Sequence, residues 1–166
     1  MIGNRNGRWS ALVCALVLVG LGLVGGCERD VDVTADEEAL LARHAFVLEA
    51  HRTGDVPGWM ASEADTVISV NRGTITYSAA ADRRARRVRY LGSTSFSVYR
   101  DLRPPLVKVS DDGTLGWVIA EVEIRGVRKG EDGTETPVDS IWAWIELYEK
   151  NEEEWKAIGN VANMRP

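Results

Sequence analysis

The sequence has few of the residues that build covalent or metal-based supports. It contains two cysteines and two histidines in 166 residues. Cys14 lies in an N-terminal apolar segment, and the other cysteine is Cys27. A domain that begins after Cys27 has no thiol left for a disulfide or a cysteine-based metal site, so its stability must come from packing. His44 and His51 lack partners at ligand spacing, and we therefore predict no metal and no other cofactor.

The chain also lacks an excess of positive charge. It carries 20 basic and 25 acidic residues, a formal net charge of −5. The first 26 residues hold Arg5 and Arg8 and no acid, so the remainder has 18 basic residues and a net charge of −7. Attraction to phosphates dominates nucleic-acid binding, and this balance argues against a nucleic-acid partner. The 45% of hydrophobic residues argues against disorder, and about 140 residues after the leader are enough for one domain.

The first 26 residues have the layout of a secretory signal. A short basic start precedes an apolar run over residues 11–24, which is too short for a comfortable membrane span. The following Val24-Gly25-Gly26-Cys27 resembles the bacterial lipobox, in which small residues precede a cysteine that is lipidated and becomes the new N-terminus. The resemblance implies a signal peptide over 1–26, lipid on Cys27 and a tether over 27–34. An ordinary signal-peptidase cut and an uncleaved anchor are the alternatives.

The lipobox also implies a cellular address. Two or more acyl chains hold a protein firmly on a membrane, so we expect an exported protein anchored to the cell envelope. Glu28, and not an aspartate, follows the cysteine. By resemblance to the Gram-negative sorting rule, this favours the outer membrane, with the domain facing the periplasm.

Three helices are predicted in the first half of the domain. Thr34-Ala35-Asp36-Glu37 has the pattern of a capping box, which predicts a helix that starts at Thr34 and ends at Gly54. Asp55 is suited to cap a short second helix. Ser78 is expected to cap a third helix that runs to Leu91.

His44 and His51 lie on the apolar stripe of the first predicted helix. An imidazole titrates near neutrality, so either residue could serve as a general base or contact a ligand in a pocket. Both could equally be hydrogen-bonded histidines at the interface between helix and sheet. The sequence leaves both interpretations open.

The third predicted helix is crowded with arginines. Arg83, Arg84, Arg86, Arg87 and Arg89 fall within seven positions; Arg83, Arg86 and Arg87 share one face, while Ala81, Ala85 and Val88 lie toward another. A tethered domain would meet anionic lipid head groups, which such a helix could contact. The spacing is also that of an ordinary solvated face, paired with acidic residues elsewhere in the chain.

The rest of the domain is predicted to be an antiparallel sheet of about six strands. Alternating and β-branched runs, each closed by a turn, cover residues 66–70, 74–77, 94–102, 106–109, 115–127, 141–149 and 155–164. The fold class is therefore α+β. Prolines 104 and 105 donate no ladder hydrogen bond and predict a bulge or kink that curves the sheet.

The two long strands are predicted to place aliphatic side chains toward the helices. Their other faces carry Trp117, Trp142, Trp144 and Tyr148, together with Glu121 and Glu146. Such an apolar outer face suggests a homodimer, whereas aromatic pairing across strands and a ligand platform are the alternatives. Desolvation among the aromatic rings could raise the pKa of either glutamate.

Four sequence motifs are informative about the family: His51-Arg52-Thr53-Gly54-Asp55, Val109-Ser110-Asp111-Asp112-Gly113-Thr114-Leu115-Gly116-Trp117, Trp144-Ile145-Glu146-Leu147-Tyr148-Glu149-Lys150 and Trp155-Lys156-Ala157-Ile158-Gly159-Asn160. Together with the order of the predicted elements, they resemble the cone-shaped nuclear transport factor 2-like superfamily, and in particular its SnoaL-like branch, over about residues 35–164. The resemblance implies a curved sheet covered by three N-terminal helices, a domain over 35–166, and a pocket between the sheet and the helices.

The resemblance implies two kinds of function. Members include isomerases, cyclases and dehydratases with an aspartate or histidine base inside the cone, as well as binding and assembly domains that are not catalytic. No acid falls among the inward strand positions predicted here, which favours a binding or assembly module for a small apolar molecule. The alternative is an isomerase- or dehydratase-type enzyme with His44 or His51 as its base. Trp59, Tyr77 and Asn160 are the further residues expected to line the pocket.

Overall fold

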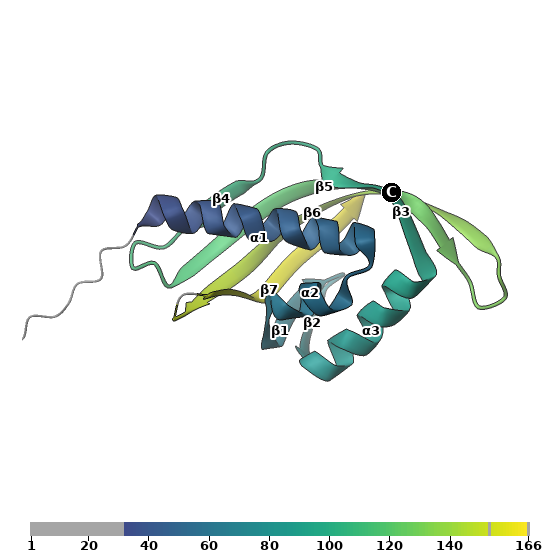
Figure 1. Cartoon of the computed structure of the whole chain (residues 1–166), viewed down its shortest axis with the longest axis horizontal. Helices are drawn as coiled ribbons and strands as arrows, with labels where there is room; N and C mark the ends of the chain where they lie inside the picture. Colours follow the sequence, from purple (N-terminus) through teal and green to yellow (C-terminus); the bar gives the residue numbers. More distant parts are fainter. Residues whose placement is uncertain (1–31, 153, 166) are drawn as a thin grey trace, which may run out of the picture.

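A computed structural model describes residues 32–152 and 154–165, which form three helices and seven strands (Figure 1). In chain order the elements are α1 (Val33–Thr53), α2 (Val56–Ala61), β1 (Glu63–Asn71), β2 (Thr74–Ala79), α3 (Ala80–Ser93), β3 (Thr94–Asp101), β4 (Leu106–Val109), β5 (Leu115–Lys129), β6 (Glu135–Asn151) and β7 (Glu154–Arg165). The predicted signal peptide, the lipidation site Cys27 and the tether up to residue 31 lie outside the described residues. Within these residues, no helix is long and apolar enough to cross a membrane.

Side-chain caps define the ends of the first two helices. The predicted Thr34 cap is wrong, because the side chain of Asp32 accepts the hydrogen bond from the amide of Ala35 and α1 begins at Val33. An aspartate is also the better partner for the positive end of a helix dipole. Gly54 ends α1 with a left-handed φ of 76°, as expected. The predicted Asp55 cap of α2 is confirmed by its bond from the amide of Gly58.

The N-cap residue of α3 is Ala79, one residue after the predicted Ser78. Ala79 occupies the N-cap position and makes no side-chain hydrogen bond there. Ser78 belongs to β2, and its hydroxyl accepts a hydrogen bond from Arg86 instead. The serine therefore links the strand to the helix rather than capping it.

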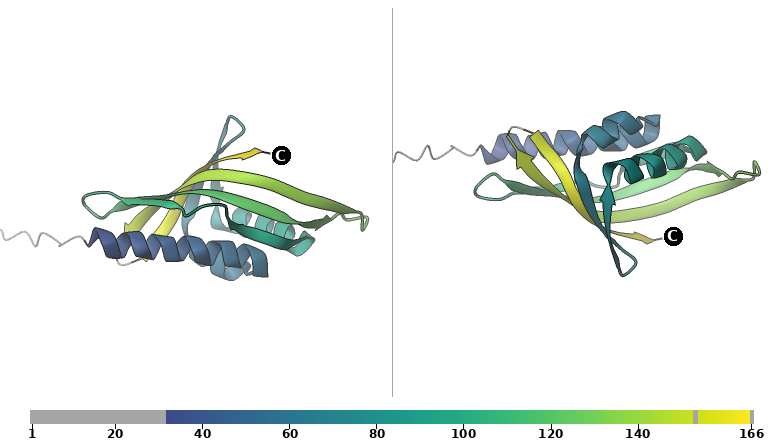
Figure 2. Two further views of the ribbon diagram at one scale, coloured as in Figure 1. Left: turned by 90° about the horizontal axis from the view of Figure 1, so that it is seen from above. Right: turned by 90° about the horizontal axis from the view of Figure 1, so that it is seen from below.

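The seven strands form one curved sheet with the order β2-β1-β7-β6-β5-β3, and β4 pairs with β5 beside β3. The three helices lie on one face of this sheet (Figure 2). The predicted α+β class and curved sheet are confirmed, but the sheet is mixed because β1 pairs with β7 in parallel. The longest pairing joins β5 and β6, whose hairpin extends beyond the helices.

The register of β5 and β6 decides which side chains face the helices. Residues opposite each other in an antiparallel pair point to the same face of the sheet. On β5 the inward residues are aliphatic, as predicted, and Val118 and Val122 are fully buried. Ala120 pairs with Trp144 and Val122 pairs with Trp142, so both tryptophans point inward as well. The predicted faces of β6 are therefore reversed.

A register shift interrupts the alternation of side chains along β3. The shift lies between Phe96 and Val98, where Gly126 of β5 sits opposite. Beyond it, Tyr99 pairs with Ile124 and faces the helices, whereas simple alternation from Phe96 places it outward. A bulge adds a residue to one strand and so inverts the alternation on one side of it.

The core continues along the sheet under the helices. Its narrow end is packed around Leu40 of α1, Val118, Tyr148 and Trp155. A second cluster joins Leu48 to the middle of β5, and a third joins α2 to Leu91 of α3. The second and third clusters leave a space between them, and this space is the candidate site.

Candidate functional site

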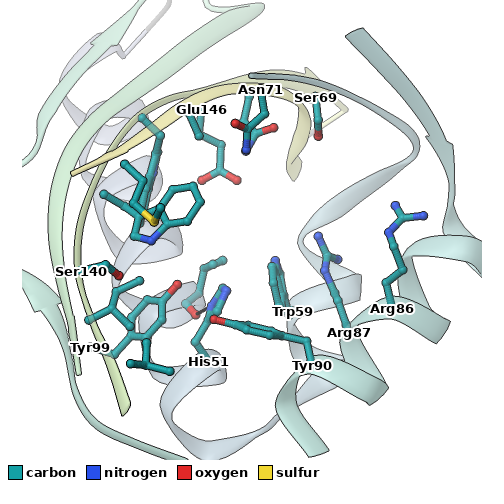
Figure 3. Close-up of a pocket in the computed structure, with 18 of the residues that line it drawn as sticks. His51, Trp59, Ser69, Asn71, Arg86, Arg87, Tyr90, Tyr99, Ser140 and Glu146 are labelled. Atoms are coloured by element: carbon teal, nitrogen blue, oxygen red, sulfur yellow. Dashed lines mark hydrogen bonds between the residues drawn. The ribbon is translucent and has the colours of Figure 1, made fainter. Parts of the chain in front are cut away.

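A cavity of about 660 Å³ lies between the inner face of the sheet and the helices (Figure 3). Small-molecule sites in proteins enclose roughly 300–1,000 Å³, so this cavity is of the size that binds a ligand. Residues from α1, α2, α3 and from five strands line it. The register of β5, β6 and β7 supplies its apolar wall, which includes Ile124, Trp142, Trp144 and Met164.

His51 lies in this wall near the end of α1. Its Nδ1 is 2.7 Å from the carbonyl oxygen of Val47, which can only accept, so Nδ1 carries the proton and Nε2 carries a lone pair. The ring contacts those of Trp59 and Tyr99, with centroids 3.7 and 4.6 Å away (Figure 3). Burial lowers the pKa of His51 to about 4, and the nearby positive charge of Arg87 acts in the same direction. His51 is therefore neutral at physiological pH and offers an acceptor.

His44 is packed two turns earlier on α1 and does not line the cavity. Its side chain is only 1% exposed, and its Nε2 lies 2.9 Å from Oδ1 of Asp101. Its Nδ1 is buried without a hydrogen-bond partner among the described residues. His44 is therefore a hydrogen-bonded histidine between helix and sheet, which is the second of the two interpretations for this residue.

Glu146 projects from the middle of β6 into the cavity (Figure 3). The hydroxyl of Tyr148 donates a hydrogen bond of 2.8 Å to Oε2 of this carboxyl. Burial raises the pKa of Glu146, an effect that the hydrogen bond partly offsets. The prediction that no acid faces inward is therefore wrong. Desolvation raises a carboxyl pKa here, which the sequence suggested only as one alternative and for the outer face of the sheet.

An ion cluster closes one side of the cavity. The carboxyl of Glu63, on β1, is 4% exposed and accepts a hydrogen bond of 2.9 Å from Nε of Arg83 and two further bonds from Arg87. Arg83 also donates to three backbone carbonyl groups, and the guanidinium of Arg87 lies 3.6 Å from the centre of the Trp59 ring. Both arginines are thus satisfied by the protein itself. The predicted solvated face of α3 is wrong for Arg83 and Arg87, which are largely buried, whereas Arg86 is exposed; all three line the cavity.

The structure separates the other predicted site residues into two groups. Trp59 and Asn160 line the cavity, as expected. Tyr77 is 71% exposed on β2 and lies outside it. Among the residues predicted to form a dimer face, only Trp117 is on the outer side of the sheet. Trp142 and Trp144 line the cavity, and Tyr148 is buried in the core.

Sequence reasoning missed Glu146 because both faces of β6 are apolar. Ile141, Ala143, Ile145 and Leu147 alternate with Trp142, Trp144, Glu146 and Tyr148, so hydrophobicity does not distinguish the two sets. No local signal in this alternation could have found it, because the pairing of β6 with β5 decides which set faces inward. Among the described residues, no group of three or more histidine, cysteine, aspartate or glutamate side chains is arranged to hold a metal ion.

Comparisons with known proteins identify the fold. No family model and no curated protein sequence matches this chain. Among solved structures, it is similar to a ketosteroid isomerase-like protein from Erwinia carotovora atroseptica, with a TM-score of 0.62 and 16% identity over 79% of this chain and 97% of the other. It is also similar to a nuclear transport factor 2-like (NTF2-like) protein from Cytophaga hutchinsonii, with a TM-score of 0.61 and 14% identity over 77% of this chain and 97% of the other.

A third similar structure is a proposed dehydratase from the NTF2-like family of Streptomyces avermitilis. Its TM-score is 0.60, with 14% identity over 78% of this chain and 96% of the other. Identities this low establish a shared fold and leave function open. The chain therefore has the NTF2-like cone fold, as the resemblance predicted.

Proposed function

We propose that this protein is a lipid-anchored envelope protein whose SnoaL-like cone domain binds a small, largely apolar molecule without transforming it. The observation that carries the proposal is the cavity of about 660 Å³, whose apolar wall meets polar and charged side chains. Such a combination is typical of small-molecule sites, in which apolar contacts supply affinity and a few polar groups orient the ligand. The lipobox around Cys27 supports the anchor and the address.

A fluorescent dye tests the binding function on the fragment from residue 28 to 166, which contains every described helix and strand. We expect N-phenyl-1-naphthylamine or its sulfonated relative, 8-anilinonaphthalene-1-sulfonate, to bind one saturable site with a rise in fluorescence. Ala162→Phe places a ring in the cavity wall and should abolish the signal. Ala143→Phe is the matched control, because Ala143 pairs with Asn163 on the outer face. Failure of both dyes to saturate would contradict the proposal.

The anchor has its own test in the full chain. Cells that express the protein and take up an alkyne-labelled fatty acid should attach the label to it, and Cys27→Ala should remove the label. Cys14→Ala is the matched control, because Cys14 lies within the predicted signal peptide. Equal labelling of the Cys27→Ala protein would disprove lipidation at this position.

An isomerase- or dehydratase-type enzyme is the second candidate, and Glu146 is the observation that favours it. A carboxyl with a raised pKa inside an apolar cavity is suited to move a proton on a bound carbonyl compound. His51 is the weaker base of the two, because a pKa of about 4 gives little driving force for proton abstraction near neutral pH. Catalysis therefore remains the second candidate function, after ligand binding.

Proton exchange distinguishes the two functions once a ligand is found by native mass spectrometry of the fragment in metabolite extracts. An enzyme of this kind should exchange an acidic C–H hydrogen of the ligand for deuterium from the solvent. Glu146→Gln should stop that exchange and retain binding, because glutamine keeps the shape of the side chain without its proton-transfer capacity. A ligand recovered without deuterium from the wild-type protein favours the binding function.

A further inference from the structure

Only some of the arginines that line the cavity form an ion pair with a carboxylate. Glu63 is shared by Arg83 and Arg87, which accounts for one carboxylate and two of the four arginines in the lining. The other two arginines are Arg86 on α3 and Arg128 on β5. In the part of the chain that the structure describes, neither has a carboxylate within ion-pair distance.

Arg86 and Arg128 have neutral partners instead. A terminal nitrogen of Arg86 donates a hydrogen bond of 2.9 Å to the hydroxyl of Ser78. The guanidinium of Arg128 lies 5.5 Å from the centre of the Tyr90 ring. Tyr90 is four residues beyond Arg86 on α3, so the two side chains share a face of the helix. The two arginines therefore border the same side of the cavity, where α3 approaches the β5–β6 hairpin.

The remaining carboxyl groups in the lining do not cancel this charge. Asp139 is mostly exposed and lies 3.7 Å from the guanidinium of Arg125. Glu146 belongs to the opposite, sheet side of the cavity, where it accepts its bond from Tyr148 (Figure 3). Burial raises the pKa of Glu146 and so favours its neutral form. The cavity thus has an apolar wall on β6 and β7 and a positively charged side at α3.

We propose that the ligand is a small amphipathic anion, with an apolar body against Trp142 and Trp144 and one carboxylate, sulfonate or phosphate at Arg86 and Arg128. This inference rests on the proposed binding function and names the ligand class for the same cavity. Arginine recognises such groups through its planar fork of donors. An uncharged ligand of the same shape would leave both guanidinium groups without an ionic partner.

Two dyes that differ by one anionic group test the ligand class. 8-Anilinonaphthalene-1-sulfonate carries a sulfonate on the ring system of N-phenyl-1-naphthylamine, which is neutral. Both arginines are exposed, and each charged contact at an exposed site contributes a few-fold in affinity, so we expect the wild-type fragment to bind the sulfonate dye about tenfold more tightly. Arg86→Gln and Arg128→Gln together should reduce that preference to about twofold or less.

The control variant carries the same change in net charge, with both of its substitutions on α3. Arg84 and Arg89 are exposed on α3 and do not line the cavity, so Arg84→Gln with Arg89→Gln should keep the preference of the wild-type protein. Circular dichroism melting curves check that both double variants are folded. The proposal is overturned if the two dyes bind equally, or if the control variant loses the preference as fully as the cavity variant. Failure of both dyes to bind would instead reject the binding function itself.

Competition with natural amphiphiles identifies the source of the anion. Displacement of the sulfonate dye by sodium dodecanoate alone indicates a free acid, and displacement by lysophosphatidylglycerol indicates a membrane lipid. Either result supports an amphipathic anion as the ligand. If 1-dodecanol displaces the dye as well as dodecanoate does, the charge is not recognised and the inference is wrong.

Discussion

His44 and His51 lie two turns apart on one stripe of α1, yet the surrounding elements give them different chemistry. Nε2 of His44 lies 2.9 Å from a carboxyl oxygen of Asp101 on β3, and the core encloses the ring. His51 reaches the cavity, and a backbone carbonyl of its own helix determines which nitrogen carries the proton. The tautomer of His51 is therefore a local property of α1, whereas its access to a ligand depends on the whole fold.

The low pKa of His51 predicts a specific pH dependence of stability. The unfolded state takes up a proton below about pH 6.5, while the folded state resists it until about pH 4. Stability should thus fall as the pH drops through this window, by on the order of 3 kcal/mol from this residue alone. Glu146 acts in the opposite direction, because its raised pKa stabilises the folded state at lower pH.

Comparison with His51→Asn isolates the histidine, because both proteins keep Glu146 and asparagine retains a donor for the Val47 carbonyl. Urea unfolding at pH 7.5 and pH 5 should show a greater loss of stability for the wild-type protein than for the variant. An NMR titration in which His51 protonates near pH 6.5 would contradict the prediction.

The ion cluster of Glu63, Arg83 and Arg87 predicts a large loss of stability from a small substitution. Glu63→Gln removes the charge that Arg83 and Arg87 share, and both guanidinium groups remain largely buried. We expect the free energy of unfolding to fall by about 3 kcal/mol, since removing one member of a buried ion pair leaves its partner uncompensated.

The control is Glu49→Gln, which breaks an ion pair with Arg52 on the exposed face of α1. Solvent screens that pair, so this variant should keep nearly the stability of the wild-type protein in the same urea titration. Equal effects of the two substitutions would show that the Glu63 cluster contributes no more than a surface pair.

At the scale of the elements, close contact between β3 and β5 depends on a glycine. A Cβ atom added at Gly126 would lie 2.2 Å from the backbone oxygen of Ser95, at the register shift in β3. The strands would have to separate where they form the edge of the cavity. The bulge that turns Tyr99 inward is therefore maintained by the absence of a side chain on the neighbouring strand.

Gly126→Ala is accordingly expected to lower the melting temperature by several degrees, since a change of 1 kcal/mol shifts it by about 2–8 °C in domains of this size range. Gly92→Ala is the matched control, because a Cβ atom there meets nothing within 4 Å and alanine favours helix in α3. This variant should melt at the same or a higher temperature. A Gly126→Ala protein as stable as the wild type would show that the strands can separate at no cost.

At the scale of the whole molecule, the reversed faces of β6 place other residues on the outer surface where we expect a dimer contact. The outer face of the sheet carries Leu115 and Ile119 on β5 with Ile145 and Leu147 on β6, all partly exposed, next to Trp117. An apolar surface that crosses two strands is suited to contact another protein surface. We therefore propose that a homodimer forms through these aliphatic residues and not through Trp142, Trp144 and Tyr148.

Sedimentation of the fragment tests this proposal. The wild-type protein should sediment as a dimer, and Ile145→Lys with Leu147→Lys should convert it to a monomer, because two charges on each subunit would meet across the interface. Val88→Lys is the control, since Val88 is an exposed apolar residue of α3 and lies on the helical side of the molecule. A wild-type monomer at high micromolar concentration would exclude the dimer.

The sequence by itself determined the order of the elements, the α+β class and most helix and strand positions. These features depend on interactions between near neighbours, such as the Asp55 cap of α2 and the glycine that ends α1. Alternation also identified the inner face of β5, because only one of its faces is consistently aliphatic.

Only the tertiary structure decided which residues line the cavity. Both faces of β6 are apolar, so the choice between them depends on its pairing with β5, and this register joins Trp142 to Val122 and Trp144 to Ala120, which are distant in the sequence. The bulge in β3 likewise depends on Gly126 of another strand. Glu146, Arg86 and Arg128 line one cavity for the same reason: burial and charge at a site are set by distant segments, which local patterns do not encode.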